Sequence, residues 1–194
     1  MRGERCEVKK VFLIGGMSES GKSTLGRYFD SRGIPRLKII TFLKRVMVRE
    51  GATGDFVAWN ERNVKERPEW VRSTFTEEFT AAMAEQGIEC CVLESLYGPE
   101  LALHMKRVMG DDKVVVIYVN MDVGVRLQRQ MIREGLATLE EARRLLLPRD
   151  ERKREWRVPE IEPIADFVID NSGPIDELYR AADNIIRQHC PEYL

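Results

Sequence analysis

The sequence predicts an α/β protein in which about five parallel strands carry helices on both faces, in three layers. Two observations lead to this fold class. Short apolar, β-branched runs alternate with longer segments whose apolar residues recur at helical spacing, and a glycine-rich loop directly follows the first apolar run. Strands that alternate with helices form parallel sheets covered on both sides. With 194 residues, 43% of them hydrophobic, the chain suits one compact domain with a substantial core.

The opening unit is a strand at about 10–15 followed by a helix at about 22–31. Gly33 is suited to end that helix, because glycine tolerates the left-handed conformation that follows many helices. A second strand at 36–40 then leads into Thr41, whose hydroxyl makes it a candidate N-cap for the next helix, through Arg49 and Glu50.

Two further helices are expected before the third strand, at about 56–65 and from Pro68 to Gly87. Proline is favoured in the first turn of a helix, and glycine is favoured directly after the last turn. The apolar residues that recur at helical spacing in the longer helix are Val71, Phe75, Phe79, Ala82 and Met83.

The second half supplies the remaining elements, at about 88–94, 99–109, 114–119, 123–154, 167–169 and 176–189. The run at 114–119 is almost continuously apolar, which is typical of a central parallel strand. The Arg-rich helical region after it is expected to be interrupted near Gly135 and Pro148, because neither residue favours a helix interior.

The loop at 16–23, GMSESGKS, fits the phosphate-loop pattern G-x-x-x-x-G-K-[ST] between a strand and a helix. In such a loop, backbone N–H groups and the helix N-terminus converge on an anion. Lys22 is expected to reach the β- and γ-phosphates, and Ser23 to ligate Mg²⁺. A glycine-rich turn with a coincidental lysine is the alternative. The residues expected to hold the nucleotide here are Gly16, Ser18, Ser20, Gly21, Lys22, Ser23 and Thr24.

Glu94 ends the third strand, and the carboxyl ends of parallel strands form the edge where ligands bind. We therefore expect Glu94 to act either as a general base or, with Ser23, as part of the Mg²⁺ site. The alternative is a surface or helix-capping glutamate.

Arg126, Arg129 and Arg133 lie three and four residues apart, on one face of the Arg-rich helix. Arginine suits the stabilisation of a transferring phosphoryl group, so this face and Arg149 are candidate catalytic groups. The alternative is a solvated face whose arginines pair with the glutamates at 134, 140, 141 and 151.

These motifs resemble those of small-molecule kinases of the nucleoside monophosphate kinase superfamily, which have the phosphate-loop (P-loop) NTPase fold. The segments RLQR at 126–129, REGL at 133–136, EEAR at 140–143 and ADFVIDNSG at 165–173 resemble dephospho-CoA kinases. This resemblance implies one kinase domain over 1–194 with a helical lid at about 123–160. Arg129 and Arg133 would then lie over the adenine and clamp the phosphates, and Arg149 would close either on the acceptor or on the γ-phosphate. Asn171 and Gly173 would contact the adenine, although Asn-Ser-Gly-Pro is also an ordinary turn.

The acceptor side departs from that pattern. Where dephospho-CoA kinases carry an acidic motif, the second strand ends in IITF at 39–42, and 156–164 reads as an insertion. These departures argue against dephospho-CoA as the acceptor. The resemblance to nucleotide kinases implies an acceptor site in the helical region at about 41–86, with the candidate residues Arg36, Lys38, Thr41 and Arg45.

The expected function is therefore an ATP- and Mg²⁺-dependent kinase that phosphorylates a small metabolite, most simply a nucleotide or nucleoside-like molecule. Two alternatives stay open at this stage. One is a nucleotide-binding switch or slow NTPase that acts through a partner, and the other is a kinase that acts on nucleic acid. The sequence does not distinguish ATP from GTP, and it leaves the oligomeric state open, a homodimer included.

Composition and charge argue against several functions and cellular locations. Lys plus Arg number 31 against 32 Asp plus Glu, which argues against a broad electrostatic grip on nucleic acid. No apolar run approaches the ~20 residues of a membrane span, and the start at 1–6 lacks the apolar core of a secretory signal. The four cysteines, at 6, 90, 91 and 190, show no metal-binding spacing. We expect a cytoplasmic protein without a structural disulfide.

Overall fold

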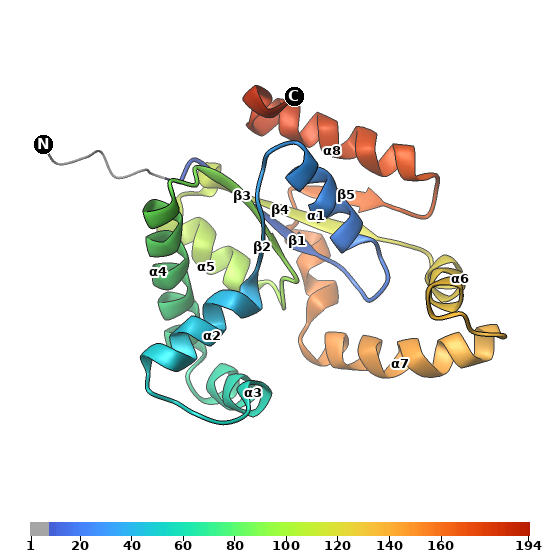
Figure 1. The fold of residues 1–194 in the computed structure, drawn as a ribbon, viewed down its shortest axis with the longest axis horizontal. Coiled ribbons are helices and arrows are strands. Elements are labelled where there is room, and N and C mark those ends of the chain that lie inside the picture. Colours follow the sequence, from blue (N-terminus) through green and yellow to red (C-terminus); the bar gives the residue numbers. More distant parts are fainter. Residues whose placement is uncertain (1–7) are drawn as a thin grey trace, which may run out of the picture.

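The computed structural model describes residues 8–194, and its centre is one five-stranded sheet with the strand order β2-β3-β1-β4-β5 (Figure 1). The strands are β1 (Lys10–Gly15), β2 (Arg36–Lys38), β3 (Cys90–Glu94), β4 (Val114–Asn120) and β5 (Phe167–Asp170). Every neighbouring pair runs parallel. The fold class predicted from the sequence is confirmed.

Eight α-helices and three short 3₁₀ helices connect and cover the strands in the described part of the chain. The α-helices are α1 (Lys22–Ser31), α2 (Ile39–Arg49), α3 (Phe56–Glu66), α4 (Pro68–Gln86), α5 (Glu100–Met109), α6 (Val123–Glu134), α7 (Leu139–Glu155) and α8 (Ile175–His189). The 3₁₀ helices are η1 (Asp111–Lys113), η2 (Val158–Ile164) and η3 (Pro191–Tyr193).

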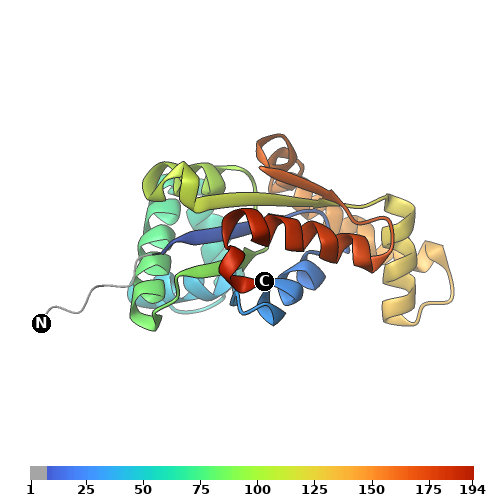
Figure 2. The same cartoon turned by 90° about the horizontal axis from the view of Figure 1, so that it is seen from above.

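The strands alternate their side chains between two cores, one on each face of the sheet. Phe12 and Ile14 of β1 pack with α1 and α8, whereas Val11 and Leu13 pack with α2, α4, α5 and η2. Figure 2 shows α1 and α8 together on one side of the sheet. Because both faces are covered, the central strands are apolar throughout, as expected for a buried parallel sheet.

The sheet register brings separate parts of the chain to one edge. Ile14 of β1 lies opposite Glu94 on one side and Ile117 on the other, so the loop after β1 emerges between the ends of β3 and β4. The backbone N–H of Asn171 donates to the carbonyl oxygen of Asn120, which places the turn after β5 at the same edge. The P-loop, residues 16–23, is therefore surrounded by β-strand ends.

Thr41 is not the N-cap that the sequence predicted. Helix α2 begins two residues earlier, at Ile39, and its cap position Lys38 makes no side-chain cap hydrogen bond. Ile39, Phe42 and Val46 are buried at helical spacing, and their packing outweighs what one capping hydroxyl contributes. Strand β2 is correspondingly shorter than predicted.

Pro148 does not interrupt the Arg-rich region as predicted, since α7 runs through it without a break. The proline costs one backbone hydrogen bond, but its ring lies on the exposed side of the helix. On the opposite side, Ala142, Leu146 and Asp150 are buried, and a capping box between Thr138 and Glu141 closes the first turn. The predicted break at Gly135 is confirmed, because Gly135 ends α6 in the left-handed conformation.

Helices α6 and α7 form an arm that stands beside the P-loop end of the sheet (Figure 1). The segment at 156–164, which read as an insertion, leads the chain from this arm back into the core. Val158 and Ile161 of η2 are fully buried there, and a Cβ at Gly15 would lie 2.9 Å from Cδ1 of Ile161. The arm is thus anchored to the sheet at both ends.

Within residues 8–194, no helix combines the length and apolarity needed to cross a membrane. The expectation about the start of the chain, at 1–6, lies outside the described residues.

Candidate nucleotide-binding and catalytic site

The P-loop has a backbone that only glycine fits at two positions. Gly16 and Gly21 have φ values of 142° and 98°. A Cβ at Gly16 would lie 2.4 Å from the carbonyl oxygen of Val119, and a Cβ at Gly21 would lie 2.1 Å from Nδ2 of Asn171. Ser18 and Ser20 of the loop are buried. Glycine-dependent loops of this kind, at the start of a helix, are the ones whose backbone N–H groups bind phosphates.

Lys22 begins α1 and its ammonium group folds back over the loop. Nζ donates to the carbonyl oxygen of Met17 at 2.5 Å. Burial, with smaller contributions from the positive charges of Lys153 and Arg126, lowers the pKa of Lys22 to about 7, against the opposing effects of Glu19 and Glu94. An ammonium group held among other cations is poised to bind an anion, because the anion relieves their mutual repulsion.

Glu94 lies at the end of β3, almost fully buried and beside the P-loop. Arg36 of β2 donates two hydrogen bonds to its carboxylate, from Nε at 2.5 Å and from an Nη at 2.7 Å. The Ser23 hydroxyl donates to the same carboxylate at 3.5 Å. The structure therefore brings Ser23 and Glu94 together, as the sequence analysis expected of a shared metal site, and adds Arg36 to them.

Gly26 makes the close approach of Glu94 to α1 possible. A Cβ at Gly26 would lie 2.0 Å from Oε1 and 2.9 Å from Cδ of Glu94. Because Arg36 holds this carboxylate from the other side, Glu94 has no room to move without losing its partner.

Gly26→Ala is therefore expected to lower the free energy of unfolding by about 1–3 kcal/mol and to displace Glu94. Arg27→Ala, at the neighbouring exposed position of α1, is the control and is expected to stay within about 0.5 kcal/mol of the native protein. Urea unfolding of both variants measures the difference. Equal stability of the two variants would contradict the packing described here.

Asn171 and Arg129 close the other side of the P-loop. The Asn171 side chain is buried and donates from Nδ2 to the carbonyl oxygen of Ser20 at 2.9 Å. Arg129 donates to the carbonyl oxygen of Asn171 at 3.1 Å. Oδ1 of Asn171 is buried without a hydrogen-bond partner among the described residues. Gly173, by contrast, is exposed beyond this group, next to Glu177.

Arg133 and Arg149 both reach Glu19 at the tip of the P-loop. Arg133 contacts its two carboxylate oxygens at 2.6 and 2.7 Å, and Arg149 lies 3.8 Å away. The side chains of both arginines are about half exposed. The structure thus brings the three predicted arm arginines, Arg129, Arg133 and Arg149, to the P-loop.

Two further cations belong to this group: Arg126, which the sequence placed on the arginine face without a partner, and Lys153, which the sequence analysis did not assign to the site. Arg126 is buried and donates from Nη1 to Asp150 at 2.7 Å and to the carbonyl oxygen of Ser18 at 3.1 Å. Lys153, one turn after Asp150, lies close enough to Lys22 to lower its pKa, and burial also lowers the pKa of Lys153 itself. The helical spacing of Asp150 and Lys153 was visible in the sequence, but it did not show which arginine faces them.

The predicted acceptor residues do not form one cluster. Arg36 lies in the site with Glu94, and Lys38 and Thr41 lie exposed at the end of β2 and the start of α2. Arg45 instead faces α4, where its guanidinium lies 3.9 Å from Glu78. It lines a surface groove of about 450 Å³ there, together with Lys44, Val48 and Arg49.

A larger groove, of about 650 Å³, lies between α4 and α5 near the amino ends of the strands, where Val8 and Lys113 line it. The P-loop is at the opposite, carboxyl edge of the sheet. This groove is therefore separate from the candidate site.

The parallel sheet, the P-loop after its central strand and the acid at the end of the adjacent strand define a P-loop kinase-like fold. No family model matches the chain. The chain is 22% identical over 180 residues to a UPF0200 protein of Pyrococcus horikoshii, covering 91% of this chain and 95% of that protein. It is 23% identical over 184 residues to a UPF0200/UPF0201 protein of Archaeoglobus fulgidus, of which it spans about half, 55%.

Solved structures with the same fold include several kinases. A sugar kinase from Janibacter sp. matches with a TM-score of 0.57 at 18% identity, over 95% of this chain and 98% of that chain. Dephospho-CoA kinase from Campylobacter jejuni matches with a TM-score of 0.53 at 15% identity, over 95% and 98% of the two chains. A gluconokinase from Sinorhizobium meliloti gives 0.54 at 15% identity, over 96% and 97%. At these identities the likeness concerns the fold.

Proposed function

We propose that this protein is a kinase that transfers the γ-phosphate of ATP, with Mg²⁺, to a small metabolite. The acceptor that we favour is a nucleotide or nucleoside-like molecule, as in the nucleoside monophosphate kinase superfamily. The observation that carries the proposal is Glu94, a buried carboxylate 3.5 Å from the Ser23 hydroxyl at the end of the P-loop, which Arg36 holds in place with two hydrogen bonds. A simple phosphate-binding domain has no need of this arrangement.

The residues present fit a nucleoside triphosphate. Gly16 and Gly21 let the P-loop pack directly against β4 and Asn171, since a Cβ at either position would collide with the Val119 carbonyl oxygen or with Nδ2 of Asn171. The buried Oδ1 of Asn171, which has no hydrogen-bond partner within residues 8–194, lies beside the loop. The positive charges of Lys22, Lys153 and Arg126 lie close together next to the P-loop. Such a cluster stabilises the charge that develops on a phosphoryl group during transfer, and this is the main protein contribution to the reaction.

The residues also fit Mg²⁺. A hydroxyl and a carboxylate are hard oxygen ligands of the kind that Mg²⁺ takes in phosphate sites, where it keeps several waters. Ser23 would hold the ion directly, and Glu94 would orient its water shell. When bound, the ion would supply neutralisation of the charge on the β- and γ-phosphates.

Glu94 is also the candidate for accepting the proton of the acceptor hydroxyl. Its tight pairing with Arg36 raises the pKa of that guanidinium and holds the carboxylate at a fixed place beside the P-loop. Arg36 would therefore act on the acceptor side either directly or by orienting Glu94. Lys38 and Thr41 are exposed next to it and extend the candidate acceptor surface along α2.

The proposal is tested by measuring the transfer of radiolabelled phosphate from ATP, in the presence of Mg²⁺, to a panel of possible acceptors. The panel contains nucleotides, nucleosides, sugars and pantothenate derivatives. We expect one acceptor class to give transfer well above ATP hydrolysis, and Glu94→Gln to lower it by about 10²–10³-fold. ATP hydrolysis that no acceptor stimulates would favour an NTPase or a switch instead. Phosphorylation of oligonucleotide ends alone would favour a nucleic-acid kinase.

The lowered pKa of Lys22 predicts how nucleotide affinity depends on pH. Free Lys22 loses its proton as the pH rises through about 7, whereas a bound triphosphate raises its pKa and keeps it charged. Binding therefore takes up a proton above pH 7, and the affinity for ATP is expected to fall by up to about tenfold per pH unit. Below pH 7 this contribution is absent.

Titration calorimetry between pH 6.5 and about 9, in buffers of different ionisation enthalpy, measures the proton uptake directly. Lys22→Arg is the matched control, because the guanidinium stays charged throughout this range. The same proton uptake in the native protein and in Lys22→Arg would exclude Lys22 as its source.

A further inference from the structure

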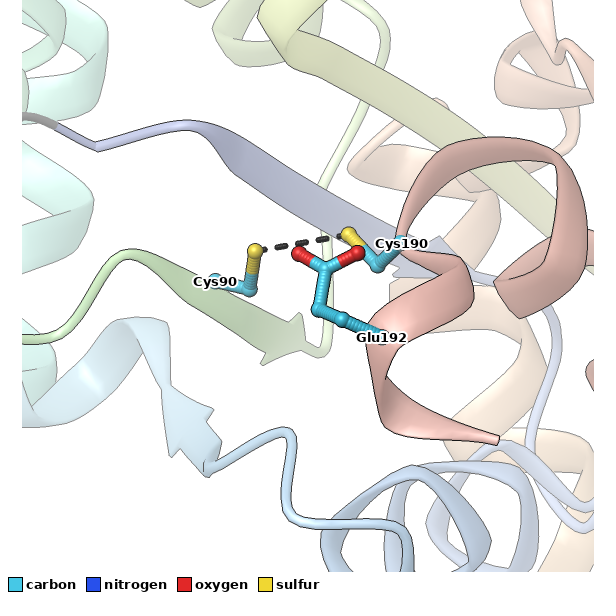
Figure 3. Close-up of side chains that lie close together, drawn as sticks. All are labelled: Cys90, Cys190 and Glu192. Atoms are coloured by element: carbon cyan, nitrogen blue, oxygen red, sulfur yellow. Dashed lines mark hydrogen bonds between the residues drawn. The ribbon is translucent and has the colours of Figure 1, made fainter.

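Two cysteines that lie 100 residues apart in the chain meet on the face of the sheet opposite α4 and α5. Cys90 is the first residue of β3, and Cys190 follows the last residue of α8. Their Sγ atoms are 3.3 Å apart, and both side chains are about 1% exposed (Figure 3). A disulfide has an S–S distance of about 2.0 Å, so closing the gap needs a movement of about 1.3 Å.

Both cysteines are held by well-packed elements. β3 is bonded to β1 and to β2, and the backbone N–H of Cys190 donates to the carbonyl oxygen of Ile186 at 2.7 Å. Helix α8 is fixed to α1 by the hydrogen bond from the Tyr28 hydroxyl to Asp183 at 2.8 Å and by the stacked rings of Tyr28 and Tyr179. The contact between the thiols thus follows from the packing of two rigid layers.

A neighbouring carboxylate disfavours ionisation of both thiols. Glu192, exposed in η3, places its carboxylate within 4.8 Å of each sulfur (Figure 3), although for Cys90 the hydrogen bond with Cys190 outweighs this effect and lowers the pKa. Glu89 acts in the same direction as Glu192 on Cys90, while the hydrogen bond from the Tyr193 hydroxyl opposes it, and Lys10 lowers the pKa of Cys190.

The hydrogen bond between the two thiols shifts their pKa values in opposite directions. It lowers the pKa of Cys90 and raises that of Cys190, as expected if the Cys190 thiol donates to the Cys90 sulfur. Cys90 is therefore the sulfur that ionises first and attacks an oxidant.

We propose that Cys90 and Cys190 form a reversible disulfide that links the end of α8 to β3 when the protein meets a peroxide. The Cys90 thiolate attacks one peroxide oxygen, the O–O bond breaks, and a sulfenic acid and water result. The Cys190 sulfur then attacks the Cys90 sulfur, and a second water leaves with the Cys190 proton. In sum, two thiols and one hydrogen peroxide give one disulfide and two waters. An added dithiol reverses the reaction by exchange.

The chain supplies its own control in Cys91. The pleat of β3 turns Cys91 to the opposite core, where it packs with residues of α4 and α5 and is buried away from Cys190. Burial raises the pKa of the Cys91 thiol, which makes it a poor nucleophile.

The test treats the reduced full-length chain with hydrogen peroxide and maps its disulfides by mass spectrometry under non-reducing conditions. We expect one Cys90–Cys190 link and a rise in Tm of about 5–15 °C that dithiothreitol abolishes, since the disulfide closes a loop of about 100 residues. Cys91→Ser and Cys6→Ser should keep both the link and the shift. Cys90→Ala and Cys190→Ala should lose them.

Glu192→Gln tests the proposal without removing a thiol. Loss of the negative charge makes the thiolate easier to form, so the disulfide should form several-fold faster at pH 7. A link that involves Cys6 or Cys91 instead, or an unchanged Tm in the linked protein, would overturn the proposal. So would binding of one Zn²⁺ that protects both thiols from alkylation and that Glu192→Gln weakens, because the cluster would then be a metal site.

Discussion

Lys22→Ala is expected to lower kcat for phosphate transfer by about 10²–10³-fold while leaving the fold intact. Lys22 is the cation closest to the expected β- and γ-phosphates, and its loss removes stabilisation that matters most in the transition state. Steady-state kinetics with the acceptor that the panel identifies measures kcat. A thermal melt measures whether the fold is intact.

The stability half of this prediction follows from the charges around Lys22. Its ammonium group is destabilised by burial and by Lys153 and Arg126, so removing it relieves repulsion in the unliganded protein. We therefore expect the Tm to stay the same or to rise. Lys9→Ala, an exposed lysine near the amino end of β1, is the control and should change neither quantity. Full activity in Lys22→Ala would disprove the assignment of the site.

The second large effect is expected from Asp150→Ala. Asp150 and Arg126 form a buried ion pair between α7 and α6, with side chains 4% and 5% exposed. Removing the carboxylate leaves a buried guanidinium without its counter-ion, which costs about 3–5 kcal/mol. For a chain of this size the Tm should fall by roughly 6–20 °C, as differential scanning calorimetry can measure.

Two further variants show whether the stability lost in Asp150→Ala comes from the unpaired buried charge or from any substitution in α7. Glu140→Ala removes the carboxylate of an exposed pair with Arg144 in the same helix and should cost less than about 0.5 kcal/mol. The double replacement Arg126→Met with Asp150→Leu removes both charges and should recover much of the stability lost in Asp150→Ala. An Asp150→Ala protein that melts like Glu140→Ala would show that the pair is not buried in solution.

The parts of this structure that could be predicted from the sequence are those determined by local patterns. The apolar runs predicted the sheet and its class, since a buried parallel strand has no polar side to confuse the signal. The P-loop depends on one contiguous motif, and Glu94 follows from the rule that strand ends gather at one edge. Predicting the contact between Glu94 and Ser23 then required only the correct order of the strands in the sheet.

The parts that could not be predicted depend on distant pairs. Whether Arg126 faces the solvent or Asp150 depends on how α6 and α7 pack, and spacing alone places three arginines on one face without saying which is buried. The bidentate contact of Arg36 with Glu94 joins two neighbouring strands that are far apart in sequence. Pro148 shows the converse, because a strong local signal for a break is overridden by the packing of one helix face.

The attachment of the α6–α7 arm at both ends has a mechanical consequence. The arm leaves the sheet at Asp122, whose carboxylate accepts hydrogen bonds from the N–H groups of Gly124 and Val125. It returns at Arg157, in the left-handed conformation, directly before the buried Val158. Because both ends are fixed, α6 and α7 form one unit. Any displacement of that unit would change the distances of Arg129, Arg133 and Arg149 from the P-loop together rather than one at a time.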